Sequence, residues 1–192
     1  TMTKAAEHKD EDTGTHINRM SEYSRLISEI QGLDQAFRKN IFYASRMHDI
    51  GKIGIPDAIL LKPGKHTPEE FEIMKTHSTL GATILAGGHS PMMEMGAEIA
   101  LGHHERWSGG GYPQNLQGEA IPLSARIVGL CAVFDALRAK RPYKPAFDHD
   151  TAVAIITKGD GRTAPEHFDP AVLEVFKQNA GMFAEIFSAY AE

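Results

Sequence analysis

The sequence predicts an all-α protein, a helical bundle of about seven helices in one domain. Apolar residues recur with the helical period through most of the chain, and no segment shows the sustained alternation of a half-buried strand. Gly and Pro clusters separate these periodic segments, as is typical of helix connections. The length of 192 residues suits one hydrophobic core, because domains commonly contain about 100 to 200 residues.

Most of the helices can be placed from their apolar stripes and end signals. The first is predicted at residues 16–30, and a second begins near Asp34, carries His48 on its inner face and ends at Gly51. A third begins at residues 67–70, whose Thr-x-x-Glu spacing with a proline at the first helical position is a capping box. The remaining helices are predicted at residues 92–106, 123–139, 150–158 and 170–190.

Composition and charge argue against several classes of protein. No apolar run approaches the roughly 18 residues of a membrane helix, so we expect no membrane association. The net charge of −5 argues against a broad DNA-binding surface, although a small anionic ligand needs only a local cationic patch. A single cysteine, Cys131, and the lack of a secretory signal predict a cytoplasmic protein.

Histidines and carboxylates on inward helix faces are the main functional signal. The chain contains ten histidines although it is mildly acidic. The inward set consists of His16, His48, Asp49, His77, His103, His104 and Asp135. The other histidines lie in predicted loops or caps and are interpreted as surface residues: His8, His66, His89, His149 and His167.

Each inward residue alone also has a structural interpretation. A single histidine on an apolar face is more often a hydrogen-bonded core residue than a ligand, and Asp135 could pair with Arg126 or Arg138. Together, imidazoles and carboxylates suit iron, manganese or zinc, so the set predicts a metal site. The adjacent pairs His48-Asp49 and His103-His104 predict more than one ion, because neighbours in a helix diverge by about 100°.

An ordered series of motifs resembles one known family. The motifs are "DTGTHINRMSEYS" (12–24), "HDIGKIGIPDAILLKPGKHTPEEFEIMKTHSTLGATIL" (48–85), "HHERWSGGGYP" (103–113) and "IPLSARIVGLCAVFDALRAKRPYKPA" (121–146). The series resembles the HD-GYP family of bacterial cyclic di-GMP phosphodiesterases, within the HD metal-dependent phosphohydrolase superfamily. The resemblance implies that residues 1–192 are a single HD-GYP domain. The abrupt start at Thr1, together with family habit, leads us to expect a fragment that lacks an N-terminal regulatory or receiver domain.

The resemblance also implies a site and an activity. It implies an HD-type bundle holding two or three divalent metal ions, usually iron or manganese, that hydrolyses cyclic di-GMP to pGpG and in many members onward to GMP. The residues that match family metal ligands are Asp12, His16, His48, Asp49, His77, His103, His104 and Asp135. The residue matching Asp49 bridges two ions, and the lysine matching Lys52 contacts a substrate phosphate, so both are expected to act in catalysis. Arg141 and Lys144 are expected to contact the substrate.

Two positions depart from the family pattern. Asp12 stands where members with three metals commonly have glutamate, and its side chain is one methylene shorter. Whether a third ion binds is therefore left open. Ser108 replaces the aspartate that is usual in the loop after the paired histidines, which removes a charge near the GYP turn. Because of both departures, the hypothesis that the protein binds its ligand with little turnover is retained as an alternative.

The expected mechanism follows from the chemistry of phosphodiesters. Two metal ions supply hydroxide from a bridging water and neutralise the phosphoryl oxygens, while Lys52 adds a point charge. Tyr112 is expected to anchor its loop or offer a surface to a protein partner, rather than to stack on guanine. Arg106 and Trp107 adjoin the paired histidines and could pack near the nucleotide. A homodimer is also expected, as is common in such regulators.

Other functions compete with this reading. An HD hydrolase for another phosphate ester, such as cyclic GMP-AMP or a mononucleotide, would use the same residues. A cyclic-dinucleotide binding module with low turnover would signal by contact. A di-iron redox or dioxygen sensor is a further alternative, although Lys52 beside the ligands favours phosphate over dioxygen.

Overall fold

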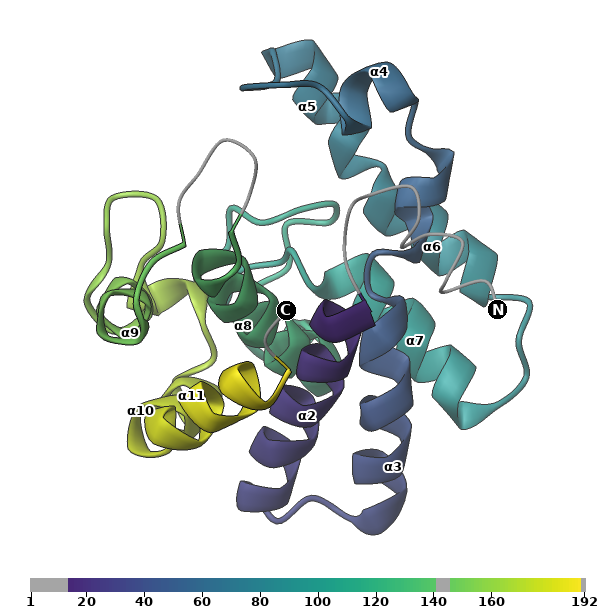
Figure 1. Ribbon diagram of the computed structural model, residues 1–192. Coiled ribbons are helices and arrows are strands. Elements are labelled where there is room, and N and C mark those ends of the chain that lie inside the picture. Colours follow the sequence, from purple (N-terminus) through teal and green to yellow (C-terminus); the bar gives the residue numbers. More distant parts are fainter. Residues whose placement is uncertain (1–13, 141–145, 191–192) are drawn as a thin grey trace.

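The computed structural model of the chain describes residues 14–140 and 146–190 (Figure 1). Those residues form helices and connecting loops without a strand, which confirms the predicted all-α class. Within those two ranges no helix is both long and apolar enough to cross a membrane. Three residues named as site candidates, Asp12, Arg141 and Lys144, lie outside the described residues.

Four helices form the body of the bundle. They are α2 (Gly14–Ile30), α3 (Gln35–Ala44), α7 (Pro91–Gly102) and α8 (Leu123–Arg138). Each packs against two of the others, in the order α2, α3, α7, α8 and back to α2. Helix α8 is buried along most of its length, because apolar side chains occupy nearly all of its faces.

Three helices near the C-terminus complete the core. They are α9 (His149–Lys158), α10 (Pro170–Gln178) and α11 (Ala180–Ala189), and a short 3-10 turn, η4 (Pro165–His167), precedes α10. They pack against α2 and α8 at one side of the bundle (Figure 1).

Aromatic side chains join these helices to the body of the bundle. Tyr23, Phe134, Phe176 and Phe183 are all fully buried. The Phe134 ring meets the other three edge-on, with ring centroids 5.4 to 5.5 Å apart. Edge-to-face pairs at such distances stabilise a core beyond their buried area, so this cluster fixes the position of α2 and α8 relative to the C-terminal helices.

The segment between α3 and α7 carries shorter elements. After the 3-10 turns η1 (Ser45–Met47) and η2 (Ile50–Gly54) come α4 (Asp57–Leu60), α5 (Pro68–Lys75) and α6 (His77–Leu85). Helix α6 packs on α7 and η2, whereas α4 and α5 project from the bundle at the top of Figure 1. A further 3-10 turn, η3 (Gly118–Ala120), precedes α8.

The predicted capping box is confirmed at the start of α5. The Glu70 N–H donates to Thr67 Oγ1 at 3.2 Å, and the Thr67 N–H donates to Glu70 Oε2 at 2.8 Å. These reciprocal bonds satisfy donors that the helix itself leaves unpaired.

Several helix ends differ from the prediction. The second α-helix ends at Ala44 instead of Gly51, and the fourth ends at Gly102 instead of residue 106. The third and last predicted helices are each broken, at Thr76 and Asn179. As a result, His48, His103 and their neighbours lie at the ends of helices and not along helical faces.

Candidate metal centre

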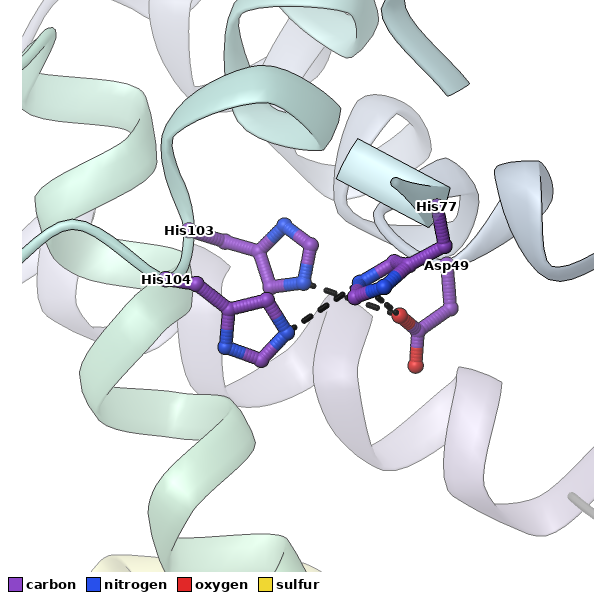
Figure 2. A group of neighbouring side chains, drawn as sticks. All are labelled: Asp49, His77, His103 and His104. Atoms are coloured by element: carbon purple, nitrogen blue, oxygen red, sulfur yellow. Dashed lines mark hydrogen bonds and ion pairs between the residues drawn. The ribbon is translucent and has the colours of Figure 1, made fainter. Parts of the chain in front are cut away.

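Four side chains converge where several elements end, as Figure 2 shows. Asp49 precedes η2, His77 begins α6, and His103 caps α7 with His104 directly after it. One ligand atom from each of these residues lies within 4.8 Å of the others. The structure therefore brings four of the predicted metal ligands together.

The distances and burial of these atoms suit a metal ion. His77 Nε2 and His103 Nε2 lie 3.3 and 3.6 Å from Asp49 Oδ1, and His104 Nε2 lies 3.1 Å from His77 Nε2. Asp49 Oδ1 and His103 Nε2 are buried and have no hydrogen-bond partner within residues 14–140 and 146–190. Buried polar atoms normally find a partner, so converging lone pairs of nitrogen and oxygen fit a divalent cation.

Backbone carbonyls orient the imidazoles. His48 and His77 each donate through Nδ1 to the carbonyl three residues earlier, at 2.9 and 2.7 Å. His103 donates through Nδ1 to the carbonyl of Ile99, four residues earlier, at 3.0 Å. A carbonyl oxygen can only accept, so in each ring Nδ1 carries a proton, and Nε2 is the nitrogen that lies toward Asp49. Histidines that bind metals are commonly oriented through the second ring nitrogen in this manner.

The charge states also suit a metal. Burial lowers the pKa of His103. Burial and the neighbouring rings of His103 and His77 also hold the pKa of His104 well below its ordinary value. Both rings are therefore neutral at pH 7. Burial alone would raise the pKa of Asp49, but Lys52 and His48 keep it well below the usual value. The Lys52 ammonium lies 2.8 Å from Asp49 Oδ2. Neutral imidazoles and an ionised carboxylate are the forms that bind metal.

Other predicted ligands form a second cluster beside these four. His48 lies next to Asp49, with Nε2 3.2 Å from Oδ2, and its ring centroid is 5.4 Å from that of His16 and 5.2 Å from that of His103. His16 Nδ1 in turn lies 2.7 Å from Asp135 Oδ2. The second cluster is therefore continuous with the first, and its role in metal binding stays a prediction.

Asp135 is held by an arginine that the sequence did not single out. Arg19 donates from Nε to Oδ1 at 2.7 Å and from Nη2 to Oδ2 at 2.9 Å. Neither partner considered from the sequence makes this pair, because Arg126 binds Asp169 and Arg138 donates to the carbonyl of Phe147. Burial would raise the pKa of Asp135, but His16 and Arg19 lower it. The position of Arg19, one helical turn after His16, was the available signal.

A glycine allows Asp49 and His77 to come close. Gly51 lies against the first turn of α6, where a Cβ atom would come within 1.9 Å of the His77 carbonyl oxygen and 2.4 Å of the Gly81 nitrogen. No larger residue fits this contact without moving one backbone. The sequence indicated Gly51 only as a helix stop, whereas the structure gives it a part in building the site.

Tyr112 of the GYP motif covers one side of the centre. Its ring stacks on His104, with centroids 4.6 Å apart and planes 23° apart, and Phe71 meets it edge-on at 6.2 Å. Lys75 lies over both aromatic rings, at 5.6 and 5.8 Å from their centroids. Burial raises the pKa of Tyr112, so the hydroxyl stays protonated. This packing agrees with the expectation that Tyr112 anchors its loop.

Comparisons with known proteins identify the family. Residues 1–172 match the HD domain family. A cyclic di-GMP phosphodiesterase of Vibrio cholerae is 47% identical over 188 residues, which cover 91% of this chain and 37% of the relative. A cyclic di-GMP phosphodiesterase of Thermotoga maritima is 46% identical over 175 residues, which cover 91% of this chain and 46% of the relative. The chain thus belongs to the HD domain family and, within it, to the HD-GYP proteins.

A solved structure supports the same fold. The cyclic GMP-AMP specific phosphodiesterase of V. cholerae superposes with a TM-score of 0.70 at 21% identity. The match covers 100% of this chain and 49% of that one. The chain spans less than half the length of each protein compared here.

Proposed function

We propose that the chain is a metal-dependent phosphodiesterase that hydrolyses cyclic di-GMP to pGpG, with GMP as a further product. The observation that carries the proposal is the convergence of His77, His103 and His104 on the Asp49 carboxylate, with Lys52 bound to the same carboxylate. The names of the two relatives that are nearly half identical support a cyclic dinucleotide as the substrate.

The four converging residues would hold the metal, and His16, His48 and Asp135 would extend the set to a second ion. We propose iron or manganese, with a third ion if Asp12 reaches the centre. Bound metal supplies a water of lowered pKa and positive charge for the phosphoryl oxygens. The ionised Asp49 favours the binding of cations, and the neutral imidazoles accept no proton that would compete with metal at pH 7.

Lys52 is placed to act on the substrate directly. Its ammonium lies 2.8 Å from Asp49 Oδ2, and its side chain is 18% exposed, so it reaches both the centre and solvent. An ammonium in such a position can transfer part of its interaction from Asp49 to a phosphoryl oxygen. That interaction strengthens as negative charge develops on the oxygen during attack.

The proposal includes further parts that follow from the family resemblance. Arg141 and Lys144 would contact the nucleotide, and the loop around Tyr112 would offer a surface to a protein partner. The buried Cys131 has no disulfide, which suits the cytoplasmic location that we propose. A homodimer and an N-terminal regulatory domain complete the proposed protein.

Turnover on two substrates tests the proposal. Protein purified without oxygen and loaded with iron or manganese should convert cyclic di-GMP to pGpG faster than it cleaves 3′3′-cyclic GMP-AMP. Asp49→Ala should lower kcat at least 100-fold, whereas Asp150→Ala, a change at an exposed carboxylate on α9, should leave it unchanged.

Two results would contradict the proposal, each in a different way. Faster cleavage of cyclic GMP-AMP would move the substrate to the other cyclic dinucleotide. Tight binding of cyclic di-GMP without product from iron- or manganese-loaded protein would indicate a binding module instead of an enzyme.

A further inference from the structure

A cavity of about 300 Å³ adjoins the metal centre. Its walls are the end of α5, the loop that follows α7, one face of α8 and the connection between α9 and α10. His103 and His104 form part of the wall, but Asp49, Lys52 and His77 do not. This volume lies at the lower end of the range for small-molecule sites, about 300 to 1,000 Å³, and suits one nucleotide or a smaller anion.

Three arginines line this cavity, and two of them have no acidic partner among the described residues. Arg126 is engaged, because its Nη1 donates to Asp169 at 2.5 Å and its Nε donates to the carbonyl of Ile121 at 2.8 Å. Arg106 and Arg162 form no ion pair with any carboxylate in the part of the chain that the structure describes. Two guanidinium groups therefore remain available to a ligand.

The carboxylates on the wall are already used. Glu105 accepts from the backbone N–H groups of Gln114 and Leu116, at 2.7 and 2.9 Å. Asp169 accepts from Arg126 and from the N–H of Ala171, where it caps α10. Within the described part of the chain, the lining contains four cations, Lys75, Arg106, Arg126 and Arg162, and only these two carboxylates, so the cavity has an excess of positive charge.

His167 adds a neutral donor to the wall. Its Nδ1 lies 3.2 Å from the Ala164 N–H and accepts from it, so Nε2 carries the proton. Burial lowers the pKa of His167, and the charge of Arg106 lowers it further, so the ring is neutral at pH 7. The backbone N–H of Trp107 donates to the His167 carbonyl at 2.8 Å, which fixes the two walls relative to each other.

We infer that this cavity binds a phosphate monoester through Arg106 and Arg162, with His167 as an additional donor. Guanidinium groups bind phosphate oxygens through paired N–H donors, and a monoester carries more negative charge than the diesters of a cyclic dinucleotide. The ligand would be free phosphate or the terminal phosphate of a linear nucleotide. The site shares His103 and His104 with the proposed metal centre, but the arginines and His167 that would bind the phosphate belong to neither that centre nor its Lys52, so the inference does not require catalysis.

Trp107 offers a direct readout, because it is the only tryptophan in the chain and lines the cavity. Titration of the protein with GMP or inorganic phosphate, at constant ionic strength, should give a saturable change in its fluorescence. Arg106→Gln and Arg162→Gln should each weaken this binding at least tenfold, because each removes a charge-assisted contact. Arg25→Gln, a change on the exposed side of α2, should have no effect.

The titrations also separate the two sources of the ligand. Equal affinity for phosphate and GMP would assign the site to the phosphate group alone, and tighter binding of GMP would assign it to a nucleotide. Either result supports the inference if the two arginines are required. A change that does not saturate, or that persists in both arginine variants, would overturn it.

The same titration should give unchanged affinity for GMP in Asp49→Ala, whose metal centre is disabled. Loss of binding in that variant would overturn the inference by showing that the metal centre captures the phosphate. Because this result does not require turnover, the inference can fail or survive independently of the proposed phosphodiesterase activity.

Discussion

Replacement of Gly51 by alanine should disrupt the metal centre without removing any ligand. The new Cβ atom would lie 1.9 Å from the His77 carbonyl oxygen, whereas real contacts of Cβ atoms essentially never fall below 3.0 Å. The two backbones must therefore separate by roughly 1 Å, since the carbonyl belongs to the backbone and cannot rotate away. Asp49 and His77, which lie on either side of this contact, would separate with them.

The expected effect is a loss of both stability and metal affinity. Forced overpacking typically destabilises a protein by about 1 to 3 kcal/mol, and a clash between backbones belongs at the upper end. Metal ligands must stay within about 0.2 Å of their preferred distances, so a shift of roughly 1 Å should empty the site formed by Asp49 and His77.

Metal content per chain and urea unfolding measure the two effects. Gly181→Ala is the matched control, because that glycine lies in helix α11 with open space around it. The control should bind metal normally and be slightly more stable, since alanine is the better helix former. Normal metal content and unchanged stability in Gly51→Ala would show that this backbone contact does not hold Asp49 and His77 in place.

Two further predictions concern buried charge. Arg19→Ala should lower the free energy of unfolding by about 3 to 5 kcal/mol, because Asp135 stays buried without its guanidinium partner. The control Arg25→Ala, which breaks exposed ion pairs on the same helix, should lower it by about 1 kcal/mol or less. Equal losses of stability in urea unfolding would contradict this prediction. The metal-free protein should lose stability as the pH falls below 6.5, by up to about 1.4 kcal/mol per pH unit for each of His103 and His104. The reason is that both histidines bind protons in the unfolded chain at this pH but not when buried in the folded protein. An unfolding free energy that stays constant from pH 7.5 to 5.5 would contradict this prediction.

Local signals predicted the helices well. The capping box at Thr67 and Glu70 needs only residues that are close in sequence, and it is present as expected. The apolar period of α2 also follows from the sequence, because one stripe of this helix must be buried, whereas α8 is recognised by apolar residues on nearly all of its faces.

Helix ends were harder to predict, because they depend on contacts beyond the apolar period. The α3 helix stops at Ala44, and the next carbonyl, that of Ser45, bonds to the His48 ring. The α7 helix stops at Gly102, whose carbonyl accepts from the N–H of Glu105, three residues later, at 2.9 Å. The sequence therefore predicted that four of these side chains converge, but it placed them along helical faces instead of at helix ends.

Partners that are distant in the sequence were not predicted. Arg19 and Asp135 are separated by 116 positions, and the only local signal for their pairing is that Arg19 lies one helical turn after His16. His167 was interpreted as a surface residue, but the structure places it half-buried on a cavity wall. Both relations appear only once the helices are packed.

The most direct test of the central claim is a titration of chelator-treated protein with manganese, with formation of pGpG from cyclic di-GMP as the readout. We expect no product without metal, and a rate that rises until at least two ions are bound per chain. Hydrolysis by metal-free protein, or no hydrolysis by fully loaded protein, would show that the chain is not a metal-dependent phosphodiesterase.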